Sequence, residues 1–209
     1  MPQENVKSNL TVNTPFSENT VIMLYPEAYY KIIFHSLSYA HRYLDKNSWS
    51  EVMGFLSGSL NKEDDNEFIH ITKSWPISHG DTVSVTIDNY GIVLNKILIK
   101  LSETNENILG WYHSHPSYGL FMSQTDFETQ ISYQRLFKKA VALVFDHTLW
   151  SSIHSGIEAY RLLEDFQNFE KIPIEISNHS LERNSRLYRL FMKKITGKYY
   201  LRELDSSHE

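Results

Sequence analysis

The chain contains no cysteine among its 209 residues. Disulfides, cysteine-based zinc fingers and thiol nucleophiles are therefore excluded, and any zinc ion would have to be held by histidine and carboxylate side chains. Long apolar runs are also missing. The most apolar stretch, 92–101, is short and contains Lys96 and Lys100, so no transmembrane helix is predicted. The N-terminal residues are polar and lack the apolar core of a signal peptide, which makes the cytoplasm, or the nucleus in a cell that has one, the expected location.

An excess of positive charge is missing as well. Lys and Arg number 20 against 25 Asp and Glu, and the formal net charge of −5 does not suit a protein that coats nucleic acid or an anionic membrane. With 41% hydrophobic and 22% charged residues, the chain has ordinary globular proportions and fits one domain with appendages. The basic segment 183–202 is interpreted as a solvated helix face or a face for an acidic partner.

Apolar periodicity predicts strands interspersed with helices. The strands are expected at 21–25, 51–60, 68–75, 82–87, 108–113, 140–145, 157–163 and 172–176, and the helices at 26–47, 88–102, 124–137 and 181–194. Residues 1–20 are rich in Asn, Ser, Thr and Glu and are expected to form a flexible tail. Several strands are separated by turns alone, which indicates one mixed sheet flanked by helices, an α/β or α+β structure.

Residues 113–126 carry most of the functional information. They read His113-Ser114-His115-Pro116, six further residues, and Ser123-Gln124-Thr125-Asp126. His113 and His115 end an expected strand, where residues i and i+2 point to one face, so both imidazoles could reach one ion together with Asp126 from the next helix. Three protein ligands leave the fourth position of a tetrahedral zinc ion open for water, as in catalytic sites. Each residue could instead be an ordinary polar residue, because a lone His-x-His is a weak signal.

Two further residues could supply the remaining chemistry of a zinc hydrolase. Such an enzyme needs a carboxylate to accept a proton from water. Glu51 stands out because it begins a strand of buried residues, although a charged loop residue is the simpler interpretation. Ser123 could offer its hydroxyl to a developing oxyanion, or it could cap the helix that follows. The two roles are compatible if the oxygen accepts from the backbone while its proton points at substrate.

These residues resemble the motif of the JAMM (MPN+) metalloprotease family, which has an upstream glutamate, His-x-His-Pro, six residues, Ser, two residues and Asp. The sequence matches every position, at Glu51, His113, His115, Pro116, Ser123 and Asp126. The flanking segments 51–58, 110–116 and 140–144 are similar to the branch that contains the proteasome-lid deubiquitinase and the signalosome deneddylase. The resemblance covers 21–177 and implies an MPN fold. This is a single α/β domain with a mixed curved sheet flanked by helices, followed at 178–209 by a C-terminal helix and tail.

The resemblance also implies a function. A single Zn²⁺ would be held by His113, His115 and Asp126, with Glu51 as general acid/base and Ser123 stabilising the oxyanion. Members of this branch hydrolyse the isopeptide bond between the C-terminal glycine of ubiquitin, or of a ubiquitin-like protein, and a lysine amine. The segment 76–89 is similar to a flap beside the active site of this branch, where an extended ubiquitin tail could add as a strand.

Two other functions stay open. Family members without a metal serve as scaffold subunits of multiprotein complexes, although such a protein would be expected to have lost at least one of the five site residues. Other relatives use the same chemistry on different small carrier proteins. Partners therefore include a ubiquitin-like substrate and, as alternatives, the proteasome, another MPN-domain protein or a second copy of the chain. Because the second long insertion of the lid and signalosome enzymes has no counterpart between Leu163 and Ile172, a simpler, self-sufficient enzyme is a further alternative.

Overall fold

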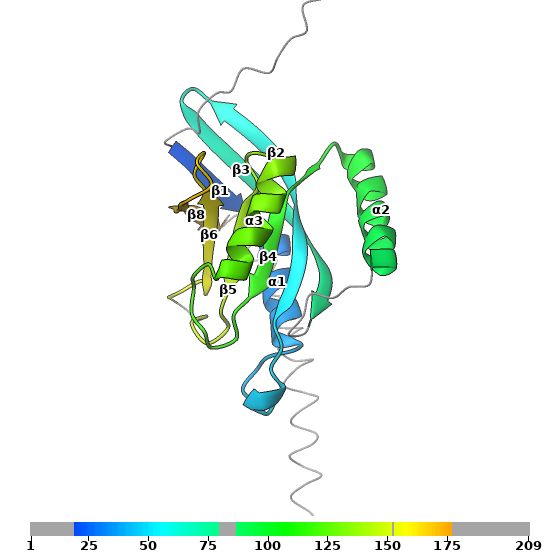
Figure 1. Ribbon diagram of the computed structural model, residues 1–209, viewed down its shortest axis with the longest axis vertical. Coiled ribbons are helices and arrows are strands. Elements are labelled where there is room, and N and C mark those ends of the chain that lie inside the picture. Colours follow the sequence, from blue (N-terminus) through cyan, green and yellow to red (C-terminus); the bar gives the residue numbers. More distant parts are fainter. Residues whose placement is uncertain (1–18, 80–86, 152, 177–209) are drawn as a thin grey trace, which may run out of the picture.

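The computed structural model describes residues 19–79, 87–151 and 153–176 (Figure 1). Within these ranges the elements are β1 (Asn19–Leu24), α1 (Pro26–Leu37), the 3-10 helix η1 (Lys46–Ser48), β2 (Val52–Glu63), β3 (Asn66–His79), α2 (Ile87–Thr104), β4 (Asn107–Ser114), α3 (Gln124–Leu136), β5 (Val141–Phe145), β6 (Ile157–Leu162), β7 (Phe169–Ile172) and β8 (Ile174–Ile176). The predicted mixed sheet flanked by helices is confirmed. None of the helices in this part of the chain is long and apolar enough to cross a bilayer.

Three predicted segments fall wholly or mainly outside the described residues. They are the N-terminal tail, the strand at 82–87 and the C-terminal helix at 181–194. Where the tail and the strand touch the described part, the structure differs from the prediction. Asn19 and Thr20 already belong to β1, and Ile87 is the first residue of α2 rather than the last of a strand.

The eight strands form one mixed sheet in the order β7-β6-β5-β4-β2-β3-β1-β8. The outer strands β7 and β8 are separated in the chain only by Pro173, yet β7 pairs with β6 and β8 pairs with β1 at the other end of the order. The sheet therefore curls until its two edges meet, and the main-chain N–H of Ile22 in β1 donates to the carbonyl of Pro173 at 2.9 Å. This closure accounts for the predicted curvature.

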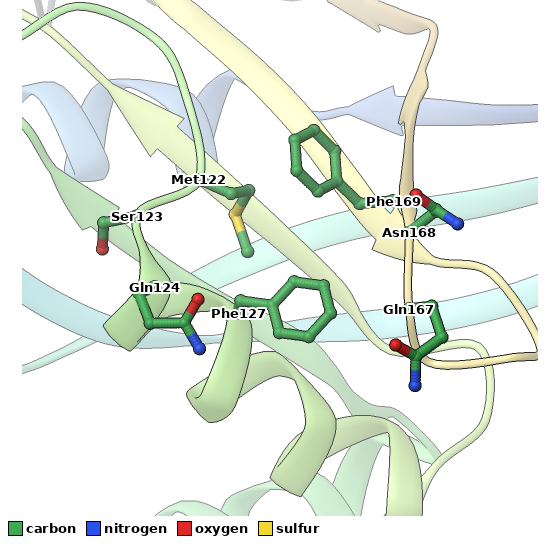
Figure 2. Close-up of a pocket in the computed structure, with 7 residues that line it drawn as sticks. All are labelled: Met122, Ser123, Gln124, Phe127, Gln167, Asn168 and Phe169. Carbon is green, nitrogen blue, oxygen red and sulfur yellow. The ribbon is translucent and has the colours of Figure 1, made fainter.

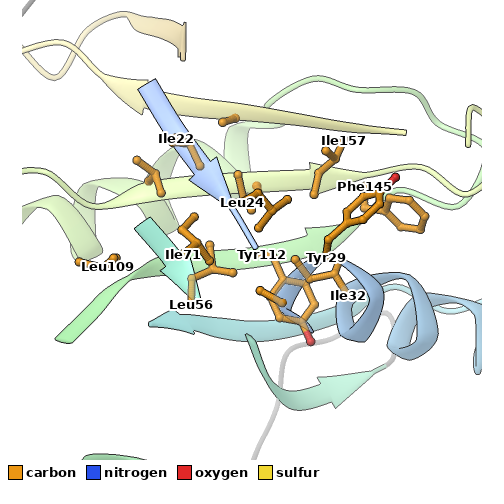
Figure 3. Close-up of a cluster of buried hydrophobic side chains, with 14 of the residues drawn as sticks. Ile22, Leu24, Tyr29, Ile32, Leu56, Ile71, Leu109, Tyr112, Phe145 and Ile157 are labelled. Carbon is orange, nitrogen blue, oxygen red and sulfur yellow. The ribbon is translucent and has the colours of Figure 1, made fainter. Parts of the chain in front are cut away.

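Helices cover both faces of the sheet. On the first face α1 covers a buried cluster that includes Ile22, Leu24, Leu56, Ile71, Leu109, Tyr112 and Phe145 (Figure 3). Its strand residues alternate except at Leu109, where the pairing of β2 with β4 shifts register. The intervening residues of the same strands face α2 and α3, among them Met53, Phe55, Trp111, Ala142 and Val144. This alternation is what a strand covered on both faces requires. Consequently Trp111 and, two residues later, His113 face α3.

Two predicted elements differ from the structure. The first helix ends at Leu37, not near residue 47. The chain leaves the helix in a tighter turn, in which the N–H of Tyr39 donates to the carbonyl of Ser36, three residues earlier, at 3.1 Å. The single strand predicted at 172–176 is two strands. Proline has no N–H for the ladder, so the chain changes partners at Pro173.

Candidate metal centre

The site lies where β4 and β5, which are parallel neighbours, both end. His113 is the penultimate residue of β4, and His115 follows the strand with its N–H bonded to the carbonyl of Phe145 at 2.8 Å. Asp126 is delivered by the first turn of α3. Ser123 and Asp126 form a reciprocal capping box, because the Ser123 hydroxyl accepts the N–H of Asp126 at 3.2 Å and the Asp126 carboxylate accepts the N–H of Ser123 at 2.8 Å. The N-cap predicted from the sequence is confirmed.

The three candidate ligands converge. The two histidine Nε2 atoms are 3.0 Å apart, the Nε2 of His113 lies 3.1 Å from Oδ1 of Asp126, and the Nε2 of His115 lies 3.4 Å from Oδ2. A zinc ion about 2.0–2.1 Å from each of its ligands has neighbouring ligand atoms roughly 3.3–3.4 Å apart. All three side chains are buried, with residue exposures of 4%, 4% and 8%. The donor set and its spacing therefore fit a tetrahedral divalent ion.

The electrostatics of the cluster favour a bound cation. Burial by itself would lower the pKa of His115, but the hydrogen bond and charge of Asp126, followed by the charge of Glu51 and the carbonyl of Gly119, raise this pKa above its ordinary value. Burial opposes ionisation of Asp126, yet hydrogen bonds from His113, His115 and Ser123 hold the pKa of its carboxyl far below the usual range. Both shifts mean that positive charge between these side chains is stabilised.

Different contacts set the orientation of the two imidazoles. The Nδ1 of His115 lies 3.2 Å from the carbonyl oxygen of Gly119, an acceptor that leaves Nε2 without a proton and free to bind an ion. The Nδ1 of His113 is buried and has no hydrogen-bond partner among the described residues. Its ring instead stacks on Trp111, with ring centroids 4.7 Å apart and an interplanar angle of 16°.

The structure also brings the two predicted catalytic residues to the cluster. Glu51 directly precedes β2, and its charge contributes to the raised pKa of His115. The start of β2 is tied to the motif, because the N–H of Val52 donates to the hydroxyl of Ser114 at 3.0 Å. The hydroxyl of Ser123 lies 2.6 Å from Oδ2 of Asp126. Its proton is thus directed to that carboxylate and would have to turn away from it to meet a substrate oxygen.

Two buried residues that were not among the predicted site residues support the site. Gln130 of α3 accepts the indole N–H of Trp111 at 2.8 Å, and Asp146, at the end of β5, binds the loop that follows His115. Gln130 carried only a weak signal, that of a polar residue on the inner side of a helix. Asp146 could have been found, since it comes directly after an apolar strand and side chains at the ends of neighbouring parallel strands meet at one edge.

A groove lies beside Ser123 at the start of α3. It has a volume of about 530 Å³ and lies between the start of α3 and the turn that joins β6 to β7. Met122, Ser123, Gln124 and Phe127 line one side, and Gln167, Asn168 and Phe169 line the other (Figure 2). Ser123 is the one residue of the predicted site that lines this groove, so a surface with room for a substrate segment lies next to the candidate metal centre.

The fold and the cluster define an α/β protein with a candidate three-ligand metal centre at the ends of two parallel strands. Residues 17–139, more than half of the chain, match the family described as JAB1/Mov34/MPN/PAD-1 ubiquitin protease. The chain belongs to this family, which confirms the predicted membership and the MPN fold.

The similar proteins include known subunits of two large complexes. The chain is 30% identical over 116 residues to ubiquitin carboxyl-terminal hydrolase RPN11 of Saccharomyces cerevisiae, which covers 54% of the chain and 37% of that protein. It is 40% identical over 99 residues to the 26S proteasome non-ATPase regulatory subunit 14 of Dictyostelium discoideum, and the match covers 46% of the chain and 31% of that protein. It is also 30% identical over 182 residues to COP9 signalosome complex subunit 5 of the same organism, and the match covers 75% of the chain and 54% of that protein. The matches thus span between about a third and a half of these relatives.

Proposed function

We propose that the chain is a zinc-dependent isopeptidase that hydrolyses the bond between the C-terminal glycine of ubiquitin, or of a ubiquitin-like protein, and a lysine amine. The observation that carries the proposal is the convergence of His113, His115 and Asp126 within ligand distance of one another, beside Glu51. Similarity to a protein named as a ubiquitin hydrolase supports the substrate class. The complete set of site residues favours an enzyme over a non-catalytic scaffold.

The residues of the chain divide the work of this reaction. When bound by the two histidines and the aspartate, a zinc ion would act as a Lewis acid and lower the pKa of water to about 7. Glu51 would accept the proton of the attacking water and return it to the leaving lysine amine. The hydroxyl of Ser123 would donate to the carbonyl oxygen of the scissile bond as negative charge develops there. Burial of the ligands strengthens each of these interactions, because the local dielectric is low.

The surroundings of the site support a protein substrate rather than a small molecule. Phe121 lies with its ring centroid 4.8 Å from that of His115 and is 45% exposed, and Tyr118 on the same loop is 66% exposed. Exposed aromatic side chains of this kind typically mark surfaces that meet another protein. Together with the groove beside Ser123, they offer contacts on the surface around the scissile bond.

The proposal is tested by incubating the protein with ubiquitin, or a ubiquitin-like protein, joined through its C-terminal glycine to a lysine-containing peptide. We expect cleavage at that bond, loss of cleavage after treatment with a zinc chelator, and recovery when zinc is returned. Metal analysis of the purified protein should find about one zinc per chain. Cleavage that persists in full after verified removal of the metal would disprove the proposed mechanism.

We also propose that the chain associates with a second MPN-domain chain through α2. The similar proteins are subunits of the proteasome and the COP9 signalosome. Ile92 and Ile99 lie two helical turns apart on α2 and are 54% and 62% exposed, so they form an apolar stripe at a spacing suited to helix pairing. Light scattering should show a complex for the wild-type chain, and Ile99→Glu should dissociate that complex. A wild-type chain that is monomeric and binds no MPN partner would contradict the proposed association.

A further inference from the structure

The carboxylate of Asp146 collects the hydrogen bonds of the loop next to the candidate metal centre. This side chain follows β5 and is 1% exposed. One oxygen, Oδ1, accepts the N–H of Ser117 at 3.2 Å and both the N–H and the hydroxyl of Thr148, at 2.8 and 2.7 Å. The other, Oδ2, accepts the N–H of Gly119 at 2.8 Å. A neutral amide could not accept on both sides, so the geometry requires a carboxylate.

The loop that Asp146 holds has an unfavourable backbone. Gly119 has φ of 92°, which glycine adopts without strain, whereas Ser117 has φ of 72°, in the left-handed region that residues other than glycine rarely adopt. Backbone of this kind persists only where surrounding contacts hold it in place. Besides the N–H of Thr148, Asp146 binds the N–H groups of Ser117 and Gly119, the two residues of this loop with positive φ, so the carboxylate supplies that restraint.

The loop in turn holds a candidate ligand. The carbonyl oxygen of Gly119 lies 3.2 Å from Nδ1 of His115, while the N–H of the same residue is bound to Asp146. Gly119 therefore connects the carboxylate to the imidazole in a continuous chain of hydrogen bonds. Rotation about the backbone bonds of Gly119 would turn its carbonyl away, release Nδ1 and allow the ring to rotate or to adopt the other tautomer.

We propose that Asp146 is a positioning residue of the metal centre, which fixes the 117–119 loop so that the Gly119 carbonyl holds His115 with Nε2 toward the ion. This inference rests on the proposed zinc site. Partners of this kind, which orient a ligand without touching the metal, strengthen metal binding because the ligand does not have to be ordered when the ion binds. Asp146 touches neither the candidate ligands nor a substrate atom directly, so its effect must be transmitted through Gly119.

The test is the zinc affinity of the full chain, measured by competition with a chromophoric chelator. Asp146→Asn preserves the size of the side chain but replaces one acceptor by a donor, and we expect zinc to bind about tenfold more weakly or worse. The absorption spectrum of the Co²⁺-substituted protein should shift, since it reports ligand geometry. The matched control is Asp165→Asn, which alters a carboxylate that accepts the N–H of Gln167 at 2.9 Å in the β6–β7 turn. Its zinc affinity should stay within about twofold of wild type.

A second variant keeps the proposal testable if Asp146→Asn does not fold. Gly119→Ala introduces a Cβ into open space, so it creates no clash, but it disfavours φ of 92° and with it the direction of the carbonyl. It should weaken zinc binding in the same way. In the double variant the losses should not add, because both changes break one pathway.

The outcomes separate this inference from the proposed function. If folded Asp146→Asn binds zinc within about twofold of wild type and its Co²⁺ spectrum is unchanged, the positioning role is wrong. If that variant is unfolded, wild-type zinc affinity in Gly119→Ala refutes the inference equally. A wild-type chain that binds no zinc at all would instead refute the zinc site itself, whatever the variants do.

Discussion

The indole of Trp111 lies parallel to the imidazole of His113, 4.7 Å from centroid to centroid, and this contact takes the place of a hydrogen bond to Nδ1. The indole is itself fixed, because its N–H donates to Gln130 at 2.8 Å. Gln130 also donates to Gln134 at 2.8 Å and to the carbonyl of Ala140 at 2.7 Å. One buried amide thus joins α3 to the strand that carries the histidines and to the start of β5.

Replacing this amide should destabilise the fold. In Gln130→Leu the indole N–H and the Ala140 carbonyl lose their partner inside the protein, and each unsatisfied buried group costs about 1–3 kcal/mol. Urea unfolding should therefore show a loss of roughly 2–4 kcal/mol. The control is Gln124→Leu, an exposed position on the same helix, where the change should stay within about 0.5 kcal/mol. Equal stability of the two variants would show that the Gln130 network contributes nothing.

The roles of Glu51 and His115 should separate metal binding from turnover. Glu51→Gln keeps the size of the side chain but cannot accept a proton, so we expect full zinc content and a loss of turnover of about 10²–10⁴-fold. His115→Ala should lose both zinc and activity. Metal analysis and cleavage of a ubiquitin–lysine conjugate measure the two properties. Substantial activity in Glu51→Gln would mean that another group acts as the base.

Ser123 has a structural and a proposed catalytic role, and substitutions can distinguish them. Ser123→Ala removes the helix cap, at a cost of about 1 kcal/mol, whereas Ser123→Gly costs only a few tenths at an N-cap. Both variants should lose about 10²–10³-fold in kcat because both lack the hydroxyl. Ser123→Thr, which retains it, should recover activity. If kcat follows the unfolding free energy across the series instead, capping is the only function of this residue.

The closure of the sheet depends on buried charges. The guanidinium of Arg161 in β6 is 1% exposed and lies 2.8 Å from Glu170 of β7 and 3.8 Å from Glu67 of β3, which also contacts Lys139. Glu67→Gln removes the buried negative charge between Arg161 and Lys139 and should cost about 3 kcal/mol by urea unfolding. The control Glu158→Gln removes an ion pair with the exposed Lys171 and should cost less than about 1 kcal/mol. A Glu67 variant as stable as this control would contradict the prediction.

The contribution of Asp146 should depend on pH with a defined sign. Burial opposes its ionisation, but hydrogen bonds from Thr148, Gly119 and Ser117 outweigh burial and hold the pKa of its carboxyl below the ordinary value. A lowered folded-state pKa stabilises the protein above the unfolded-state pKa of about 3.9, and this stabilisation is lost as the pH falls through the folded-state pKa. The difference in unfolding free energy between wild type and Asp146→Asn should thus be constant above about pH 5 and shrink below pH 4. Denaturant titrations with a chelator present measure this difference in unfolding free energy. A difference that grows as the pH falls would contradict the lowered pKa of Asp146.

Much of the fold could be predicted because its signals are local. The apolar run that became β5, the alternation of β3 and the cap at Ser123 each depend on neighbouring residues alone. The end of α1 was predicted wrongly because apolar residues continue at helical spacing beyond Leu37, although the chain turns out of the helix there. The split at Pro173 was missed because it depends on β1, which lies far away in the sequence but completes the curled sheet.

The sequence by itself determined which groups are available for chemistry: no thiol, two histidines one residue apart, and an aspartate in the first turn of a capped helix. These residues are close together in the sequence, and a strand followed by a helix can place them relative to one another in only a few ways. The tertiary structure alone decided that the charge of Glu51 acts on His115 and that Asp146 restrains the loop beside it. Both depend on which strands are neighbours, because antiparallel pairing of β2 with β4 and parallel pairing of β4 with β5 bring residues from distant segments to one edge of the sheet.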